Sequence, residues 1–299
     1  MTRFRRFATL LALAGLILAA CTSGASPTPA PGSEAPGTPA AGGLLDKVMA
    51  AGKIVMSTDP QYPPQSELNP NSTYGYEGFD IDVGAEIAKR LGVKIEFITP
   101  TWDTVTAGSW SGRWDFSVGS MTITTPRQKV LAFSKPYYYT PAQITASNVS
   151  GITTYDGLAG KTICVGAATT YFDWLNGDLD LGPYTSLILQ QPPEGAKATT
   201  LDTDRLCAET IKAGRKDFEG WLSSSTTVAA AIDEGLPLIK VGDPVFAEPL
   251  GVAFDLSGPD PTSMVAKVDE ILDAMRADGS LKGFSEKWFK TDFTVPPGG

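Results

Sequence analysis

Short apolar runs alternate with longer amphipathic segments through most of the chain. In residues 80–91, Ile81, Ala85 and Ala88 recur at helical spacing, and Gly92 follows as a stop. Similar patterns predict strands at 54–57, 94–99, 115–121, 161–166, 218–223 and 238–241, and helices at 171–176, 202–213, 224–234, 261–278 and around 281–288. Because strands separated by helices form βαβ units, this order predicts an α/β fold with a parallel sheet.

Two extended segments interrupt that order. Residues 136–146 are rich in aromatic side chains, and residues 248–254 form a second extended stretch. We expect each to cross between two lobes. Ligands of open parallel sheets bind beyond the carboxyl ends of the strands. Candidate positions are therefore the turns after Ser57 and Val165 and the end of the strand at 115–121.

The residues around Pro126 carry the strongest candidate for binding chemistry. Thr124 or Thr125 can accept a hydrogen bond from a free N–H at a helix start, and Pro126 suits the first helical position. Arg127 then falls in the first turn, where the helix dipole favours an anion. A bound anion accounts for this placement, since N–H groups, hydroxyls and the guanidinium converge on it. The alternative is a surface turn with a solvated arginine.

The amino terminus has the pattern of an export signal. Three arginines precede the apolar residues 8–18, which are too few to span a bilayer. The small residues before Cys21 resemble a lipobox, so residues 1–21 are predicted to be a lipoprotein signal peptide that ends at a lipidated Cys21. The alternative is an ordinary secretory peptide with an incidental cysteine. Residues 22–43, rich in Pro, Ala and Gly, are predicted to be a disordered tether.

Composition narrows the function classes. Apolar residues make up 42% of the 299 residues, enough for one large or two medium domains. Removing residues 1–21 takes away three of 24 basic residues and no acid, leaving 21 basic against 33 acidic residues and a net charge of −12. This balance argues against nucleic-acid binding. The absence of histidine excludes His-based triads and His metal sites. Asp80 and Asp82 are expected as helix-start charges, so we predict no metal and no cofactor.

Several motifs in combination resemble the bacterial extracellular solute-binding proteins of family 3, the polar amino-acid receptors of ABC importers. The region of Arg127 contributes GSMTITTPR at 119–127 and FSKPYY at 133–138. Three further motifs fit the family, namely STDPQYPP at 57–64, EGFDIDVGAEIAKRLG at 77–92 and GRKD at 214–217. The resemblance covers residues 45–292.

The resemblance implies an α/β fold of the periplasmic-binding-protein-like type II, with two doubly wound lobes and a two-crossover hinge. Lobe 1 would comprise residues 44–140 plus 250–299, and lobe 2 residues 141–249. The protein would be a monomeric receptor, lipid-anchored outside the cytoplasm in the periplasm or on the outer cell surface. It would capture an amino acid or similar small carboxylate-bearing solute in a closing cleft and present it to ABC permease subunits.

The family likeness also implies contacts for the charged groups of a ligand. Arg127 would pair with the α-carboxylate. Thr122 and the backbone at Ser120 would form hydrogen bonds with the carboxylate and the ammonium. From the second lobe, Thr169 and Thr170 would offer N–H and hydroxyl groups to the carboxylate.

The rest of the ligand would meet aromatic walls. The resemblance places Tyr62 and Trp102 against its aliphatic part and Asp59 near its side-chain end. Ala168 stands where the family has glycine, so a left-handed backbone there would be strained by the Cβ.

One position departs from the family. Relatives carry an ammonium-binding aspartate where ungapped counting from GRKD gives Leu222. Because a buried ammonium needs an acceptor, Glu219 or Asp59 would have to compensate, or the ligand lacks a primary α-amine. A small alignment shift would bring Ser223 or Ser224 into the site instead.

Two cysteines remain after Cys21. Cys164 lies on a predicted strand and Cys207 on a predicted helix. Outside the cytoplasm spare thiols usually pair, and some relatives carry cysteines at similar places, so a disulfide is expected. Two buried free thiols are the alternative.

Three function classes compete. The receptor hypothesis predicts reversible binding without turnover, and the protein is then no enzyme. The resemblance extends to dehydratases of the cyclohexadienyl kind. Such an enzyme would require a catalytic carboxylic acid in the cleft, and Glu219 is the candidate. A sensory ligand-binding module is the third possibility.

Overall fold

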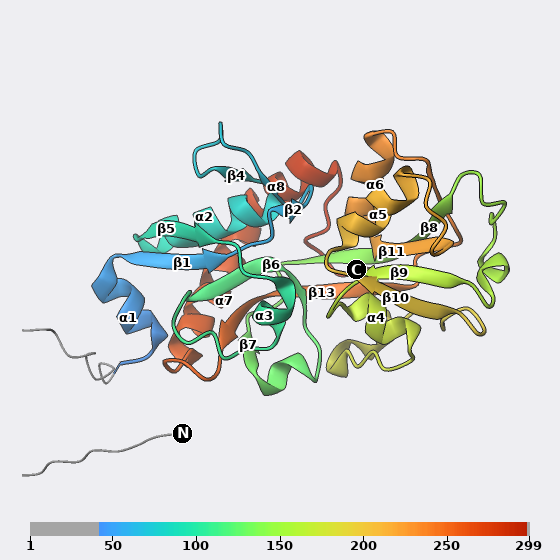
Figure 1. The fold of residues 1–299 in the computed structure, drawn as a ribbon. Helices are drawn as coiled ribbons and strands as arrows, with labels where there is room; N and C mark the ends of the chain where they lie inside the picture. The colour runs from blue at the N-terminus through green and yellow to red at the C-terminus, as the bar shows by residue number, and fades with distance from the viewer. Residues whose placement is uncertain (1–41, 298–299) are drawn as a thin grey trace, which may run out of the picture. The chain divides into compact units, whose positions relative to one another are not determined.

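Residues 42–297 are described in a computed structural model of the chain (Figure 1). The predicted signal peptide, the lipidation site at Cys21 and the tether as far as residue 41 lie outside the described residues. Within the described range, none of the helices has the length and hydrophobicity needed to cross a membrane. The same range contains no cluster of three or more His, Cys, Asp or Glu side chains suited to hold a metal ion.

Helices and strands alternate along the chain, as the sequence predicts. The helices are α1 (Leu44–Ala51), α2 (Phe79–Leu91), α3 (Trp102–Thr106), α4 (Thr170–Leu175), α5 (Asp204–Lys212), α6 (Ser225–Asp233), α7 (Thr262–Ala277) and α8 (Ser280–Phe289). Short 3-10 helices are η1 (Arg127–Lys129), η2 (Tyr155–Leu158) and η3 (Gly182–Leu187). The strands are β1 (Lys53–Ser57), β2 (Gln61–Tyr62), β3 (Ser66–Leu68), β4 (Tyr76–Glu77), β5 (Lys94–Ile98), β6 (Phe116–Thr122), β7 (Leu131–Phe133), β8 (Tyr138–Ser147), β9 (Thr162–Gly166), β10 (Lys197–Leu201), β11 (Gly220–Ser224), β12 (Leu238–Lys240) and β13 (Phe246–Asp255).

Ten of these strands form one mixed sheet. Its main path runs β10-β9-β11-β8-β13-β6-β1-β5, with β12 and β7 attached beside it. The pairs at the two ends are parallel, as expected for βαβ units. In the centre, β8 and β13 pair antiparallel with each other and with their outer neighbours. These two strands contain the segments predicted as crossovers, and Figure 1 shows them running between the two halves of the sheet.

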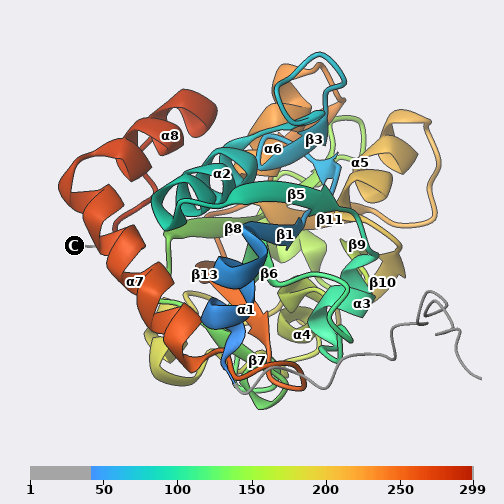
Figure 2. The ribbon, with the colours of Figure 1, turned by 90° about the vertical axis from the view of Figure 1, so that its left-hand side faces the viewer.

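Hydrophobic side chains gather in separate cores on the two sides of these crossovers. In the part that we call the first lobe, Ile54 of β1 packs in one cluster with Met264 of α7 and Leu281 of α8. Figure 2 shows these two C-terminal helices beside α2. In the second lobe, Ile163 of β9 packs with Trp174 of α4, and a further cluster lies under α5 and α6. Each lobe therefore has its own core.

One glycine fixes how the first lobe presents α2. Gly78 precedes the helix at φ 133°, and a Cβ at this position would lie 2.2 Å from the carbonyl oxygen of Gln65. Only glycine fits such a close backbone approach. The turn directs the first residues of α2, including Asp80, toward the end of β6.

Candidate functional site

A cavity lies between the two lobes, at the carboxyl ends of β1, β6 and β9 and against the crossover strand β13. This is where open α/β sheets bind ligands. Of the nine residues that the sequence nominates for ligand binding, eight line the cavity: Asp59, Tyr62, Trp102, Ser120, Thr122, Arg127, Thr169 and Thr170. The remaining nominee, Leu222, does not.

The Arg127 guanidinium is buried in the cavity wall, with 8% of the residue exposed. Its Nη1 donates to the carbonyl oxygen of Thr122 at 3.0 Å and its Nη2 to that of Ala168 at 2.9 Å. The guanidinium carbon lies 5.5 Å from the ring centre of Trp102, within the range of a cation–π contact. Burial lowers the pKa of Arg127, and nearby acids including Glu248 oppose this shift.

The local structure before Arg127 differs in detail from the prediction. Thr124 Oγ1 accepts the Arg127 N–H at 3.3 Å, as expected of a capping threonine. The helix that follows is a single 3-10 turn, Arg127–Lys129, with Pro126 at its N-cap. The short turn still holds the guanidinium inward, so the alternative of a solvated surface arginine is wrong in this structure.

The turn after β9 forms the opposite wall. Ala168 adopts φ 58°, the left-handed conformation in which a Cβ is strained. Its carbonyl oxygen accepts from Arg127 and, at 3.2 Å, from Trp102 Nε1. Thr169 caps α4 with an extended backbone, and its Oγ1 donates to the carbonyl oxygen of Gly166. The first N–H groups of α4 thus border the cavity.

Glu248 is a site residue that the sequence analysis missed. It lies on β13, is 3% exposed and lines the cavity. Its carboxylate accepts from Thr122 Oγ1 at 2.8 Å, Thr170 Oγ1 at 3.0 Å and the Tyr171 hydroxyl at 2.9 Å. Burial raises the pKa of Glu248, while these three hydrogen bonds lower it. The one sign in the sequence is an acid inside the apolar run 245–254.

Asp204 is the second residue that the sequence analysis missed. It opens α5, is 7% exposed and lines the cavity. Its Oδ1 accepts the Gly166 N–H at 2.6 Å, and its Oδ2 accepts from Ser223 Oγ at 3.2 Å. Burial, aided by the charges of Glu248 and Asp59 and opposed by these two hydrogen bonds, raises its pKa to about 7. Asp59, across the cavity, accepts the Gln61 N–H at 2.8 Å, and burial raises its pKa as well.

Leu222 requires a correction. Its side chain is fully buried, pairs in register with Ile144 of β8 and belongs to the second-lobe core with Val165. Side chains alternate across a strand, so Leu222 faces the core while its neighbour Ser223 reaches Asp204. Ungapped counting from the GRKD motif therefore selects a core position.

Glu219, the candidate for an ammonium acceptor or a catalytic acid, does not line the cavity. Its Oε2 accepts the N–H of Thr162, the first residue of β9, whereas Gly166 at the other end of that strand lines the cavity. Of the alternatives, Ser224 caps α6 and accepts from Gln65 Nε2 at 3.1 Å. These positions leave four carboxylates in the cavity wall, the exposed Asp202 and the less exposed Asp59, Asp204 and Glu248.

A buried network lies behind Ser120. Its Oγ donates to Asp80 Oδ2 at 2.7 Å, and its N–H donates to the Tyr137 hydroxyl at 3.0 Å. Tyr137 in turn donates to Asp80 Oδ1 at 2.7 Å, and the Tyr138 hydroxyl lies 2.5 Å from Ser120 Oγ. Asp80 lies in the first turn of α2, as expected of a helix-start acid, and its side chain is fully buried. Burial raises the pKa of Asp80 to about 7.

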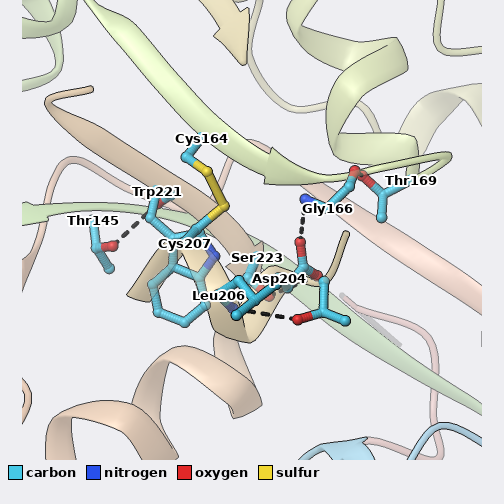
Figure 3. Close-up of a disulfide and its surroundings, with 10 residues drawn as sticks. Thr145, Cys164, Gly166, Thr169, Asp204, Leu206, Cys207, Trp221 and Ser223 are labelled. Atoms are coloured by element: carbon cyan, nitrogen blue, oxygen red, sulfur yellow. Dashed lines mark hydrogen bonds between the residues drawn. A yellow bond between two sulfur atoms is a disulfide. The ribbon is translucent and has the colours of Figure 1, made fainter. Parts of the chain in front are cut away.

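A disulfide joins Cys164 of β9 to Cys207 of α5, as expected, with the two Cα atoms 5.7 Å apart. Figure 3 shows this bond one helical turn from Asp204. The strand and the helix that it connects both contribute residues to the cavity wall, namely Gly166 and Asp204.

Solved structures with this architecture define a class, the two-lobed α/β receptors of the type II periplasmic binding fold. The ancestral amino acid-binding protein AncCDT-1, a precursor of cyclohexadienyl dehydratase, aligns with a TM-score of 0.68 and 28% identity over 82% of this chain and 99% of its own. A mutant of ArgBP from T. maritima aligns with a TM-score of 0.67 and 26% identity over 83% of this chain and 100% of its own.

The chain belongs to the bacterial extracellular solute-binding proteins, family 3, whose model matches residues 54–291. Among curated proteins it is similar to the L-cystine-binding protein TcyJ of Escherichia coli, with 29% identity over 84% of this chain and 88% of the relative. It is also similar to the ABC transporter arginine-binding protein 1 of Escherichia coli, with 26% identity over 80% of this chain and 92% of the relative.

Proposed function

We propose that this solute-binding protein captures an amino acid, or a similar small solute with a carboxylate, in the interlobe cavity. The observation that carries the proposal is the buried Arg127, an inward-facing cation on a wall of hydroxyl and N–H groups. A guanidinium in such a place is suited to bind a carboxylate through two parallel hydrogen bonds. The names of the relatives, which bind L-cystine and arginine, support an amino acid as ligand.

Within the site, we assign the carboxylate to Arg127, Thr122 and the α4 amides at Thr169 and Thr170. These groups line one cavity from both lobes, so a carboxylate there can hold the lobes together. The carbonyl oxygen of Ala168, which accepts from Arg127, would give up that contact when a carboxylate enters.

The other nominees shape the rest of the cavity in this proposal. The Trp102 ring and the Tyr62 ring would wall the aliphatic part of the ligand, and Asp59 would lie at its side-chain end. The backbone at Ser120, a residue that the hydrogen bonds to Asp80 and Tyr137 keep in place, would hydrogen-bond the ligand.

Binding would close two lobes that move about the crossovers. We assign residues 44–140 plus 250–299 to the first lobe and 141–249 to the second. Contacts between the lobes support a closed arrangement, among them the hydrogen bond from Gln65 Nε2 to Thr226 Oγ1 at 2.7 Å. A ligand that contacts both lobes stabilises this arrangement over an open one.

Outside the cleft, the proposal includes a monomeric receptor that a lipid on Cys21 anchors to the membrane and that delivers its ligand to ABC permease subunits. The lipobox-like sequence before Cys21 supports the anchor. The Cys164–Cys207 disulfide suits an extracytoplasmic location. We propose binding without turnover, since the named relatives are binding proteins.

The proposal is tested with Arg127→Ala. The twenty standard L-amino acids are screened by thermal shift, and the tightest ligand is titrated calorimetrically into wild type and variant. Each charge-assisted hydrogen bond contributes about 1.5–3 kcal/mol, so losing two bonds should weaken binding by roughly 100-fold or more. Arg113→Ala is the matched control, because that exposed arginine stacks on Trp114 instead. Equal affinities of wild type and Arg127→Ala would refute the assigned role.

A further inference from the structure

Carboxylates outnumber cationic side chains in the cavity wall. Besides the exposed Asp202, three less exposed carboxylates, Asp59, Asp204 and Glu248, line it together with Arg127. Within residues 42–297, none of the three carboxylates forms an ion pair with a lysine or arginine. Because burying an unpaired carboxylate is unfavourable, the wall is suited to a ligand that brings a positive group of its own.

Asp204 is the best placed of the three to accept that group. Glu248 already accepts three hydroxyl groups, from Thr122, Thr170 and Tyr171. Asp59 is less buried and lies in the same lobe as Arg127, so a contact with Asp59 would add nothing to the ligand's hold on the second lobe. Asp204 is more than nine-tenths buried, and each of its oxygens accepts a single protein donor, which leaves lone pairs on both.

Asp204 also lies in a lobe opposite Arg127. A zwitterion whose carboxylate is held by the first lobe and whose ammonium is held by the second joins the two lobes. Such a ligand prefers the closed state by the energy of the contact that it gains on closure, since an open protein still holds it on one lobe. Leu222, which ungapped counting equates with the acid of relatives, lies in the core and cannot make this contact.

The disulfide fixes the position of this carboxylate (Figure 3). Cys207 follows Asp204 by three residues, one helical turn along α5, and Cys164 precedes Gly166 by two residues on β9. The S–S bond and the Gly166 N–H to Asp204 hydrogen bond therefore join the same strand and helix at two neighbouring points. Two attachment points set the direction in which the first turn of α5 presents its side chains.

We infer that Asp204 accepts the α-ammonium group of the ligand, and that the Cys164–Cys207 disulfide is the device that positions it. This inference rests on the proposed function, since it takes the ligand to be an amino acid held by Arg127. The acid of the site then comes from the start of α5 instead of the end of β11.

The experiment compares each amino acid with its des-amino analogue, which keeps the carboxylate and the side chain. The amino acid of the pair is the one that binds wild type most tightly in the screen of the twenty standard L-amino acids; for L-arginine the analogue is 5-guanidinopentanoate, and for L-glutamine it is 4-carbamoylbutanoate. Removing one partner of a buried charge contact typically costs 2–5 kcal/mol. Asp204→Asn should therefore weaken amino-acid binding by about 100-fold, with less than about a threefold change for the analogue, which lacks the ammonium.

Two further variants separate positioning from folding. The double variant Cys164→Ala/Cys207→Ala should weaken amino-acid binding by about tenfold and leave the analogue's affinity nearly unchanged, since only the carboxylate is displaced. Asp233→Asn removes a charge from an exposed residue at the end of α6, outside the cavity lining, and should change neither affinity. Binding of the analogue also reports that each variant has a folded site.

The outcomes distinguish a failure of the inference from a failure of the proposed receptor function. If Asp204→Asn or the double cysteine variant weakens both probes equally, or neither, the inference is wrong while the receptor function stands. If none of the twenty standard L-amino acids binds wild type, or if the chosen pair binds equally well after Arg127→Ala, the inference and the proposed function both fail.

Discussion

Replacing Asp80 with asparagine should change how the stability of the protein depends on pH. Asp80 is fully buried among Ser120, Tyr137 and Tyr138, and burial raises its pKa from 3.8 to about 7. Its pKa is higher in the folded state, so its contribution to stability is complete below pH 3.8 and declines as pH rises to about 7. A shift of about three units at 1.36 kcal/mol per unit gives a loss of about 4 kcal/mol between these limits.

Asparagine has nearly the same shape and cannot ionise, so the Asp80→Asn variant should escape this loss. Chemical unfolding at pH 4, 5, 6, 7 and 8 would give the free energy of unfolding for wild type and variant. We expect the free energy of unfolding of the variant, relative to that of wild type, to rise by about 4 kcal/mol between pH 4 and pH 8. The other buried acids, among them Asp204, titrate in both proteins. Their contributions therefore cancel in the difference between the two free energies of unfolding.

The exposed Asp46 of α1 provides a matched control, because Asp46→Asn removes the same charge from a solvated position. The stability of this variant should follow that of wild type across the series. A difference between Asp80→Asn and wild type that stays constant from pH 4 to pH 8 would show that Asp80 ionises in the fold at its ordinary pKa. That result would refute the argument from burial.

Three further predictions concern stability and the boundary of the site. Cys164→Ala/Cys207→Ala should lower the free energy of unfolding by roughly 4 kcal/mol, the chain-entropy value for a loop closed over 43 residues; an unchanged denaturation midpoint would contradict it. Ala168→Gly should stabilise the protein by about 1 kcal/mol, since it relieves a left-handed alanine, and denaturation at fixed pH measures the sign. Leu222→Ala should cost about 2–5 kcal/mol of stability while calorimetric ligand affinity stays within twofold, and a large affinity loss would return this residue to the site.

The sequence predicts most elements of the fold because their patterns are local. The α2 helix is predicted to within one residue at its start and ends before Gly92, which takes the left-handed conformation of a C-cap. The buried strands β1, β6 and β9 are recognisable as short apolar runs. The small sheet of β2, β3 and β4 and the helix α1 were not predicted, since strands of two or three residues and a helix of two turns carry too little periodicity.

The site shows a different balance. Arg127 and its capping threonine form a motif that is contiguous in the chain, so the sequence predicts their arrangement well. Asp204 and Glu248 come from segments brought in by tertiary contacts, and no spacing in the sequence relates them to Arg127. Counting along the chain instead selected Leu222, because a shift of one residue in a strand moves a side chain to the opposite face.

The central pair of strands has a consequence for the motion of the lobes. Tyr138 lies opposite Leu250 and Ala142 opposite Phe246, so β8 and β13 form a hydrogen-bonded ribbon rather than two independent tethers. Such a ribbon can bend and twist, but it resists sliding of one strand along the other. The two lobes should therefore rotate about a hinge at this ribbon without sliding past each other. The same residues of the two lobes would then face each other across the cavity each time it closes.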